Sequence, residues 1–242
     1  PSLITFTADV RNLDLPIKKA GKEIKTLNVK GNYSKNIVNI ETLDKKIKLK
    51  YVGNSKLDIN IEGYDVLVKT NNEEESKIND LNIEGKNSNI ILNEKFKFLA
   101  DAFSLRLRDH SKYFHLNHKK TDLTFKESKD KKIDIFANDI SDVFLNTIFD
   151  KKILKGNNML LLASGTTSSL KGKMILKDVK IEDLAILNNL LLFINTSPAL
   201  INPFLAIPSL VGMASNGGFN LTGYRIVDGV LTFDYNQDKI EI

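Results

Sequence analysis

Three histidines, at positions 110, 115 and 118, are the first residues of this chain whose spacing could support metal or acid–base chemistry. In an extended strand successive side chains alternate between two faces, so His115 and His118 are expected to point in opposite directions. The 242 residues contain no cysteine, and no acidic cluster lies near the histidines to complete a metal-binding shell. We therefore expect surface or rim histidines and no metal site.

The other residues that could carry catalysis occur in patterns typical of turns and caps. Asp101 and Asp109 are a candidate carboxylate pair, but acid–base catalysis requires convergence in one pocket, which their spacing does not indicate. The serine-rich segment 164–169 lacks the spacing of a nucleophile elbow, and the glycines at 217–218 lack the pattern of a phosphate-binding loop. The sequence thus predicts a protein that is not an enzyme and uses no cofactor.

Length and composition place the chain among folded globular proteins. Its residues are 42% apolar and 27% charged, which fits neither wholesale disorder nor a polytopic membrane protein. The net charge of +5 comes from the first 50 residues, where a basic surface could meet an anionic partner. Most of the 35 basic residues are lysines, whereas nucleic-acid readers favour arginine and stacked aromatics. We expect lysines on solvated strand faces and no nucleic-acid partner.

Apolar residues alternate with polar ones along most of the chain, the pattern of β-strands with one buried face. Examples are Ile4 to Val10, Ile47 to Tyr51, Leu57 to Ile61, and Phe103 to Leu107. Such strands belong to a sheet that is wet on one face and dry on the other. A second sheet, closure into a barrel, helices or a ligand could each cover the dry face.

A short unit, apolar-x-apolar-x-glycine, recurs at residues 27–31, 59–63, 81–85 and 219–223. Its first three glycines, Gly31, Gly63 and Gly85, are unevenly spaced, which excludes a rigid solenoid repeat. We interpret the unit as a meander of strands whose ends are marked by glycines in turns or bulges.

Two stretches break the alternation. Between 139 and 149 the apolar residues follow helical spacing, with Asp139 or Ser141 as the cap. A second helical pattern spans 182–206 and opens a stretch, 184–224, without any charged side chain. Asparagines and prolines interrupt that stretch, so no run reaches the roughly 20 apolar residues of a membrane-spanning helix. We expect broken apolar helices that dock on the dry face, lie at a membrane surface, or do both.

Several short motifs follow one another in the second half of the chain. The run Phe193-Ile194-Asn195-Thr196-Ser197-Pro198-Ala199-Leu200 comes after Leu187-Asn188-Asn189-Leu190-Leu191. It is followed by two further motifs, Gly223-Tyr224-Arg225-Ile226 and Gly229-Val230-Leu231-Thr232-Phe233. In this order the motifs resemble the C-terminal region of the AsmA-like family, which includes AsmA, TamB and YhdP, and are most similar to its YhdP-like branch. The resemblance covers residues 133–242 and is most specific in the run from Phe193 to Leu200, whereas residues 1–132 share only the generic strand pattern.

The resemblance implies a protein of the bacterial periplasm, anchored to the inner membrane by a segment outside this chain. Such proteins are thought to form a β-groove along which phospholipids move between the membranes during outer-membrane biogenesis. It implies one continuous β-groove over residues 1–242, with repeated strands in 1–132 and the AsmA-like region in 133–242. The implied partners are phospholipids, together with a membrane surface or membrane proteins at the groove ends.

From the pattern and the resemblance together we predict a mainly β protein with a few short helices. A long, curved antiparallel β-sheet would form an open hydrophobic groove, with apolar helices packed near its C-terminal part. The predicted function is that of a non-enzymatic lipid carrier. Its groove would shield phospholipid acyl chains during transport between the inner and outer membranes. The lipid-binding side chains would be Ile47, Leu49, Tyr51, Leu57, Ile59, Ile61, Phe103, Leu105, Leu107, Leu161, Met174, Leu176, Leu190, Phe193, Leu221 and Phe233.

Two alternatives stay open at this level. The uncharged helices between 184 and 213 either gate one end of the groove or only complete the hydrophobic core. The whole chain could instead be a closed β-sandwich, a structural or interaction module of the cell envelope without lipid cargo. An open dry face would favour the carrier, and a fully capped face would favour the module.

Overall fold

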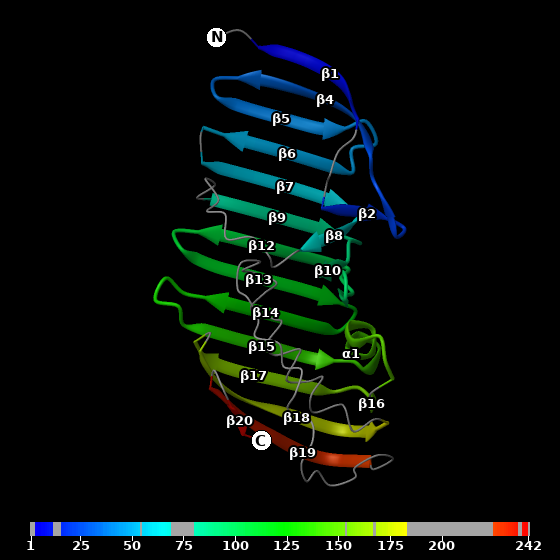
Figure 1. Cartoon of the computed structure of the whole chain (residues 1–242), viewed down its shortest axis with the longest axis vertical. Helices are drawn as coiled ribbons and strands as arrows, with labels where there is room; N and C mark the ends of the chain where they lie inside the picture. Colours follow the sequence, from blue (N-terminus) through cyan, green and yellow to red (C-terminus); the bar gives the residue numbers. More distant parts are fainter. Residues whose placement is uncertain are drawn as a thin grey trace.

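One large β-sheet dominates the computed structural model of the chain (Figure 1). The described residues are 3–11, 16–53, 55–68, 80–152, 154–166, 168–182, 225–236 and 239–241. Within them the structure is mainly β with a single helix, which confirms the predicted β class. The alternation of apolar and polar residues along the strands gives this sheet one apolar face and an opposite face that is mostly polar, although it carries the exposed Phe136 and Val230.

The large sheet contains fifteen strands. They run across the long axis of the molecule and are stacked along it (Figure 1). The small strand β16 (Leu154–Lys155) pairs only with β18. The other strands lie side by side in the order β1 (Ile4–Arg11), β4 (Thr26–Ser34), β5 (Ile37–Thr42), β6 (Ile47–Val52), β7 (Lys56–Glu62), β9 (Asp80–Lys86), β12 (Ala102–Arg108), β13 (Ser111–His118), β14 (Thr121–Glu127), β15 (Ile133–Ile140), β17 (Met159–Gly165), β18 (Ser169–Ile181), β19 (Arg225–Asn236) and β20 (Lys239–Glu241).

The sheet is mixed, which corrects the prediction of an antiparallel sheet. Strands β7 and β9 run parallel, with Lys56 opposite Asp80 and Glu62 opposite Lys86. After β7 the chain leaves the large sheet to form β8 (Asp65–Val68) elsewhere, and it then enters the large sheet again in the direction of β7. Parallel neighbours require such a crossover, because a hairpin cannot connect them.

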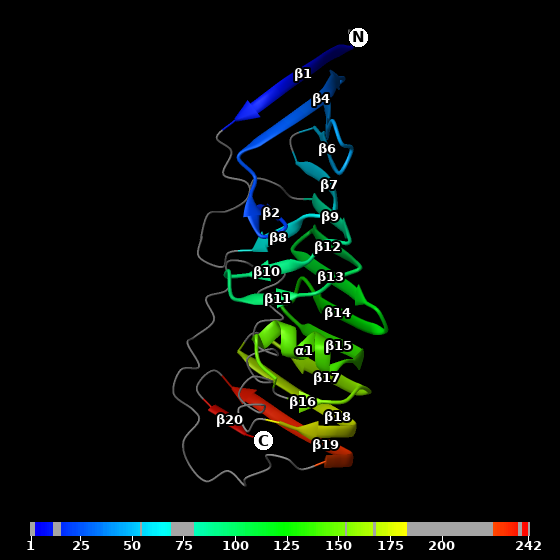
Figure 2. The ribbon, with the colours of Figure 1, turned by 90° about the vertical axis from the view of Figure 1, so that its right-hand side faces the viewer.

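A second sheet of five strands lies over part of one face of the large sheet (Figure 2). Each of its pieces is an excursion of the chain from the same end of the large-sheet strands, after β1, β7 or β9. Its strands follow the order β11 (Phe96–Phe98), β10 (Ile90–Leu92), β8, β2 (Ile17–Lys19) and β3 (Lys22–Glu23). The second layer is therefore built from short insertions between strands of the first.

Two-residue turns close hairpins at the other end of the large sheet. Lys35 and Asn36, between β4 and β5, have φ of 49° and 63°, and Asp109 and His110, between β12 and β13, have φ of 48° and 62°. Positive φ at both central residues matches the right-handed twist of the flanking strands. At this end the two turns connect neighbouring strands of the large sheet directly.

The helix α1 (Asp142–Phe149) confirms the first of the two helices predicted. Ser141 is its cap, since its hydroxyl accepts a hydrogen bond from the Phe144 amide at 3.2 Å. Asp139 instead lies in a register shift between β15 and β17, where its φ is 48°. The helix ends at Asp150, which adopts the left-handed conformation. The second predicted helix, 182–206, lies outside the described residues from position 183 onwards.

Candidate functional site

Side chains on the face of the large sheet that meets the second sheet and α1 are aligned in continuous rows. The central row contains an apolar residue or a glycine from each of thirteen strands, joined by cross-strand pairing. Its members are Phe6, Gly31, Ile40, Leu49, Ile59, Ile83, Leu105, Phe114, Phe125, Ile135, Ala163, Gly172 and Phe233.

The residues predicted to bind lipid fall on this apolar face wherever the structure describes them. Those in the first half of the chain are Ile47, Leu49, Tyr51, Leu57, Ile59, Ile61, Phe103, Leu105 and Leu107, and those in the second half are Leu161, Met174, Leu176 and Phe233. Leu190, Phe193 and Leu221 lie outside the described residues. The alternation in the sequence therefore assigned the face correctly.

Glycines on the apolar face lie beneath phenylalanine rings of the neighbouring strand. Gly31 is opposite Phe6, and Gly85 is opposite Phe103. A Cβ atom on Gly85 would lie only 2.0 Å from Cε1 of Phe103, so the ring occupies the space that a side chain would need. Both glycines lie inside strands, and the interpretation of the repeated unit as a strand end is wrong for them. It holds for Gly63, which follows β7 with a φ of 73°.

The apolar face is sealed by protein from β13 to β18. Leu123, Phe125 and Leu161 are fully buried. Phe144 of α1 packs edge-on against Phe98 of the second sheet, with ring centroids 6.4 Å apart. Part of the predicted lipid-binding set is buried, inside this region or beside it, and cannot meet a lipid in this structure. Leu161, Met174 and Leu176 are buried within the sealed region, and Ile61 on β7, Phe103 on β12 and Phe233 on β19 are buried outside it.

The same face is only partly covered from β1 to β12. Ile4 is 56% exposed, Tyr33 is 41% exposed and Phe6 is 37% exposed, and the residues that follow them across the sheet are half-buried. Over these strands the central row and the row beside it, which begins with Ile4 and Tyr33, together form what we call the apolar strip. It consists of Ile4, Phe6, Tyr33, Val38, Ile40, Leu49, Tyr51, Leu57, Ile59, Leu81, Ile83, Leu105 and Leu107.

The apolar strip crosses seven strands. At about 4.8 Å per strand it is roughly 29 Å long, about twice the ~15 Å of hydrocarbon in one bilayer leaflet. It contains six of the predicted lipid-binding residues, and the half-buried Ile47 lies beside it. The sequence prediction missed the others, although the alternation around Phe6 and Ile83 offered a signal for them.

A charged cluster interrupts the apolar face where the strip ends. Lys112 lies between Leu107 and Glu127 in the row that carries Tyr51 and Leu57 in other strands. The Glu127 side chain is 1% exposed and accepts hydrogen bonds from Lys112 Nζ at 3.2 Å and from Lys131 Nζ at 3.3 Å. We call these three residues the charged cluster.

Burial shapes the energetics of the charged cluster. It lowers the pKa of Lys112, and the adjacent Glu127 carboxylate opposes that lowering. A buried ion pair is often no more stabilising than apolar side chains of the same volume. The sequence prediction missed this cluster. Lys112 is two residues from the buried Phe114, and Glu127 is two residues from the buried Phe125, so the alternation already placed both charges on the apolar face.

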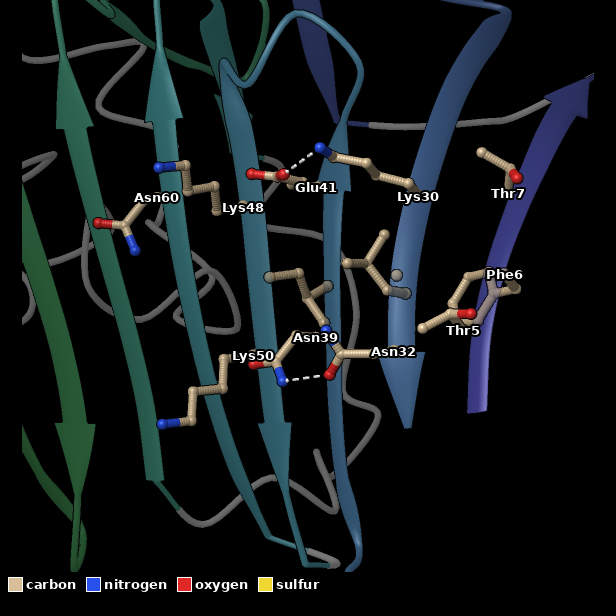
Figure 3. A pocket seen from close by; sticks show the side chains of 13 residues that line it. Thr5, Phe6, Thr7, Lys30, Asn32, Asn39, Glu41, Lys48, Lys50 and Asn60 are labelled. Carbon is tan, nitrogen blue, oxygen red and sulfur yellow. Dashed lines mark hydrogen bonds and ion pairs between the residues drawn. The ribbon is translucent and has the colours of Figure 1, made fainter. Parts of the chain in front are cut away.

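Over β1 to β7 the opposite face of the sheet is polar and is hollowed (Figure 3). The hollow has a volume of about 790 Å³. Lys30 Nζ lies 2.9 Å from Glu41 Oε1, and Asn39 donates a hydrogen bond to Asn32 at 2.9 Å. The hydrogen bond from Lys30 lowers the pKa of the Glu41 carboxyl. Much of this polar surface is therefore paired with itself, as expected for a solvated sheet face.

The histidines at 115 and 118 lie on opposite faces, as predicted. His115 is on the polar face, with Nε2 2.9 Å from Asp122 Oδ2. His118 stacks on Phe144 of α1, and its Nδ1 lies 3.3 Å from Asp101 Oδ1. In the part of the chain that the structure describes, no three histidine or acidic side chains converge as metal ligands.

Comparison of the chain with protein-family models, curated proteins and solved structures found no match. No described helix is long and apolar enough to cross a membrane. We therefore base the functional proposal on the apolar strip and on the resemblance noted in the sequence.

Proposed function

We propose that the chain is a non-enzymatic lipid carrier whose apolar strip shields phospholipid acyl chains from water. In keeping with the AsmA-like resemblance, the carrier would act in the bacterial periplasm, anchored to the inner membrane by a segment outside this chain. It would move phospholipid between the inner and outer membranes, with a membrane surface or membrane proteins at the ends of its path. The observation that carries the proposal is the strip itself, an apolar surface that crosses seven strands and stays partly exposed.

The energetics of lipid transfer explain why such a surface is useful. A two-chain phospholipid has about 30 methylene groups, and their exposure to water costs more than about 20 kcal/mol at roughly 0.8 kcal/mol each. Acyl chains that lie along the strip, against side chains such as Leu49, Ile59 and Leu105, avoid much of that cost. Soluble proteins seldom leave a contiguous apolar surface uncovered unless it binds something.

The contacts between acyl chains and the strip are non-directional, so no single side chain needs to perform chemistry. Small apolar substitutions would weaken binding gradually. A charge inside the strip would be desolvated by a bound acyl chain, which is costly. Leu49→Asp therefore tests the proposal, and Lys50→Asp is its matched control, because the exposed Lys50 follows Leu49 on β6 and faces the polar side.

The test is the phospholipid that co-purifies with the full chain, measured by mass spectrometry after organic extraction. We expect bound phospholipid in the wild type and in Lys50→Asp, and its loss in Leu49→Asp. Far-ultraviolet circular dichroism of all three proteins checks that the sheet is intact. Wild-type protein that carries no phospholipid, and takes none up from vesicles, would refute the proposal.

The sealed region supports a second candidate, a structural or interaction module without lipid cargo. Over β13 to β18 the second sheet and α1 give the chain an ordinary closed core with Phe125 and Phe144 at its centre. A module of this kind would purify without lipid, and Leu49→Asp and Lys50→Asp would then behave alike. The same extraction experiment therefore separates the two candidates.

A further inference from the structure

The charged cluster carries more positive than negative charge at the end of the apolar strip. Two ammonium groups, of Lys112 and Lys131, meet one carboxylate, of Glu127. Each ammonium has three N–H donors, and Glu127 is the one acceptor that the described residues offer to either. Donors are therefore left over for a further anionic acceptor.

The location of the charged cluster connects it with both the strip and water. Lys112 directly follows Leu107 of the strip across the β12–β13 pair. The Lys131 side chain is 62% exposed and belongs to the turn between β14 and β15. An acyl chain would have to desolvate these charges to continue along the same row, which is unfavourable. The polar end of a lipid, in contrast, would find hydrogen-bond donors there.

We propose that the charged cluster binds the anionic headgroup of a lipid whose acyl chains lie on the apolar strip. This inference rests on the proposed carrier function and adds a headgroup preference to it. An ammonium pair compensated by only one carboxylate complements a headgroup with a net negative charge, such as phosphatidylglycerol. A zwitterionic headgroup brings its own cation, which the two lysines repel.

The test offers delipidated full chain an equimolar mixture of phosphatidylglycerol and phosphatidylcholine vesicles with identical acyl chains. Bound lipid is then extracted and quantified by mass spectrometry. We expect phosphatidylglycerol to be enriched about tenfold, the effect of one charge-assisted hydrogen bond at a partly exposed site. Lys131→Gln should lower the enrichment to about one while total bound lipid stays unchanged. Lys126→Gln is the control, because the exposed Lys126 lies on β14 but faces the polar side.

The possible results separate this inference from the carrier proposal. Equal uptake of both lipids by the wild type, or an enrichment that Lys131→Gln leaves unchanged, would overturn the headgroup site and leave the carrier intact. Failure to take up either lipid would overturn both. In a parallel titration, inorganic phosphate alone should bind much more weakly than phosphatidylglycerol. Equal affinity would identify a site for free anions and overturn the lipid assignment.

Discussion

Leu49 and Leu123 are leucines on the same face of one sheet, yet we assign them different roles. Leu49 is half-buried in the apolar strip, whereas Leu123 is 0% exposed in the sealed core. A Leu→Ala change at a fully buried position loses transfer free energy and leaves a cavity, at a cost of about 2–5 kcal/mol. At Leu49 solvent can fill the vacated space, so only about half of the transfer term is lost, roughly 1 kcal/mol.

These costs translate into different losses of thermal stability. About 1 kcal/mol corresponds to about 2–4 °C in a chain of this size, so we expect Leu123→Ala to lower the unfolding midpoint by about 4–20 °C and Leu49→Ala by about 2–4 °C. Thermal unfolding of delipidated protein, followed by far-ultraviolet circular dichroism, measures both. Equal losses for the two variants would show that protein seals the strip as it seals the core, and the reasoning would be wrong.

Three further predictions follow from the same structure. Gly85→Ala brings a Cβ atom to 2.0 Å from the buried Phe103 ring on β12 and should lower the free energy of unfolding by about 1–3 kcal/mol through overpacking. An unchanged free energy of unfolding in a denaturant titration would contradict the close approach. Glu127→Leu leaves two lysines without their carboxylate and should lower the free energy of unfolding by about 3–5 kcal/mol. The double variant Lys112→Met/Glu127→Leu should leave the free energy of unfolding close to that of the wild type. Equal losses in the two variants would argue against a buried ion pair. The hydrogen bond from the Thr42 hydroxyl lowers the pKa of Asp44 below its usual 3.8, so its stabilisation is present above about pH 4 and is lost as pH falls through the lowered pKa. Asp44→Asn should therefore flatten the acid limb of a stability–pH curve, and an unchanged limb would exclude this role.

Local signals in the sequence were enough to predict most strands of the large sheet and the helix α1. Period-two alternation around Leu49, Ile59 and Leu105 gave both the strands and the face on which these side chains lie. Ser141 lies three residues before the first buried apolar residue of α1, which made it a candidate cap. These features depend on residues close together in the chain, where propensity and periodicity carry the information.

Features that depend on distant residues could not be predicted in the same way. The short strands β8 and β10 contain too few residues for alternation to tell whether they join the large sheet or a second one. The parallel pairing of β7 with β9 arises because the chain leaves the large sheet at β8 and returns to it at β9. The ring of Phe103 over Gly85 joins two strands whose register the sequence does not reveal. Lys112 and Glu127 each occupy a position in their strand where the alternation calls for an apolar residue, but the sequence does not reveal that they pair with each other.

The most direct test of the carrier proposal is photo-crosslinking on the two faces of β6. The photoreactive residue p-benzoylphenylalanine is placed at position 49, within the strip, or at position 50, on the polar face, and the full chain is irradiated after incubation with phospholipid vesicles. We predict a phospholipid adduct, detected as a mass shift of the intact protein, at position 49 and none at position 50. Equal labelling at both positions, or labelling at neither, would contradict the proposal that acyl chains lie on the apolar strip.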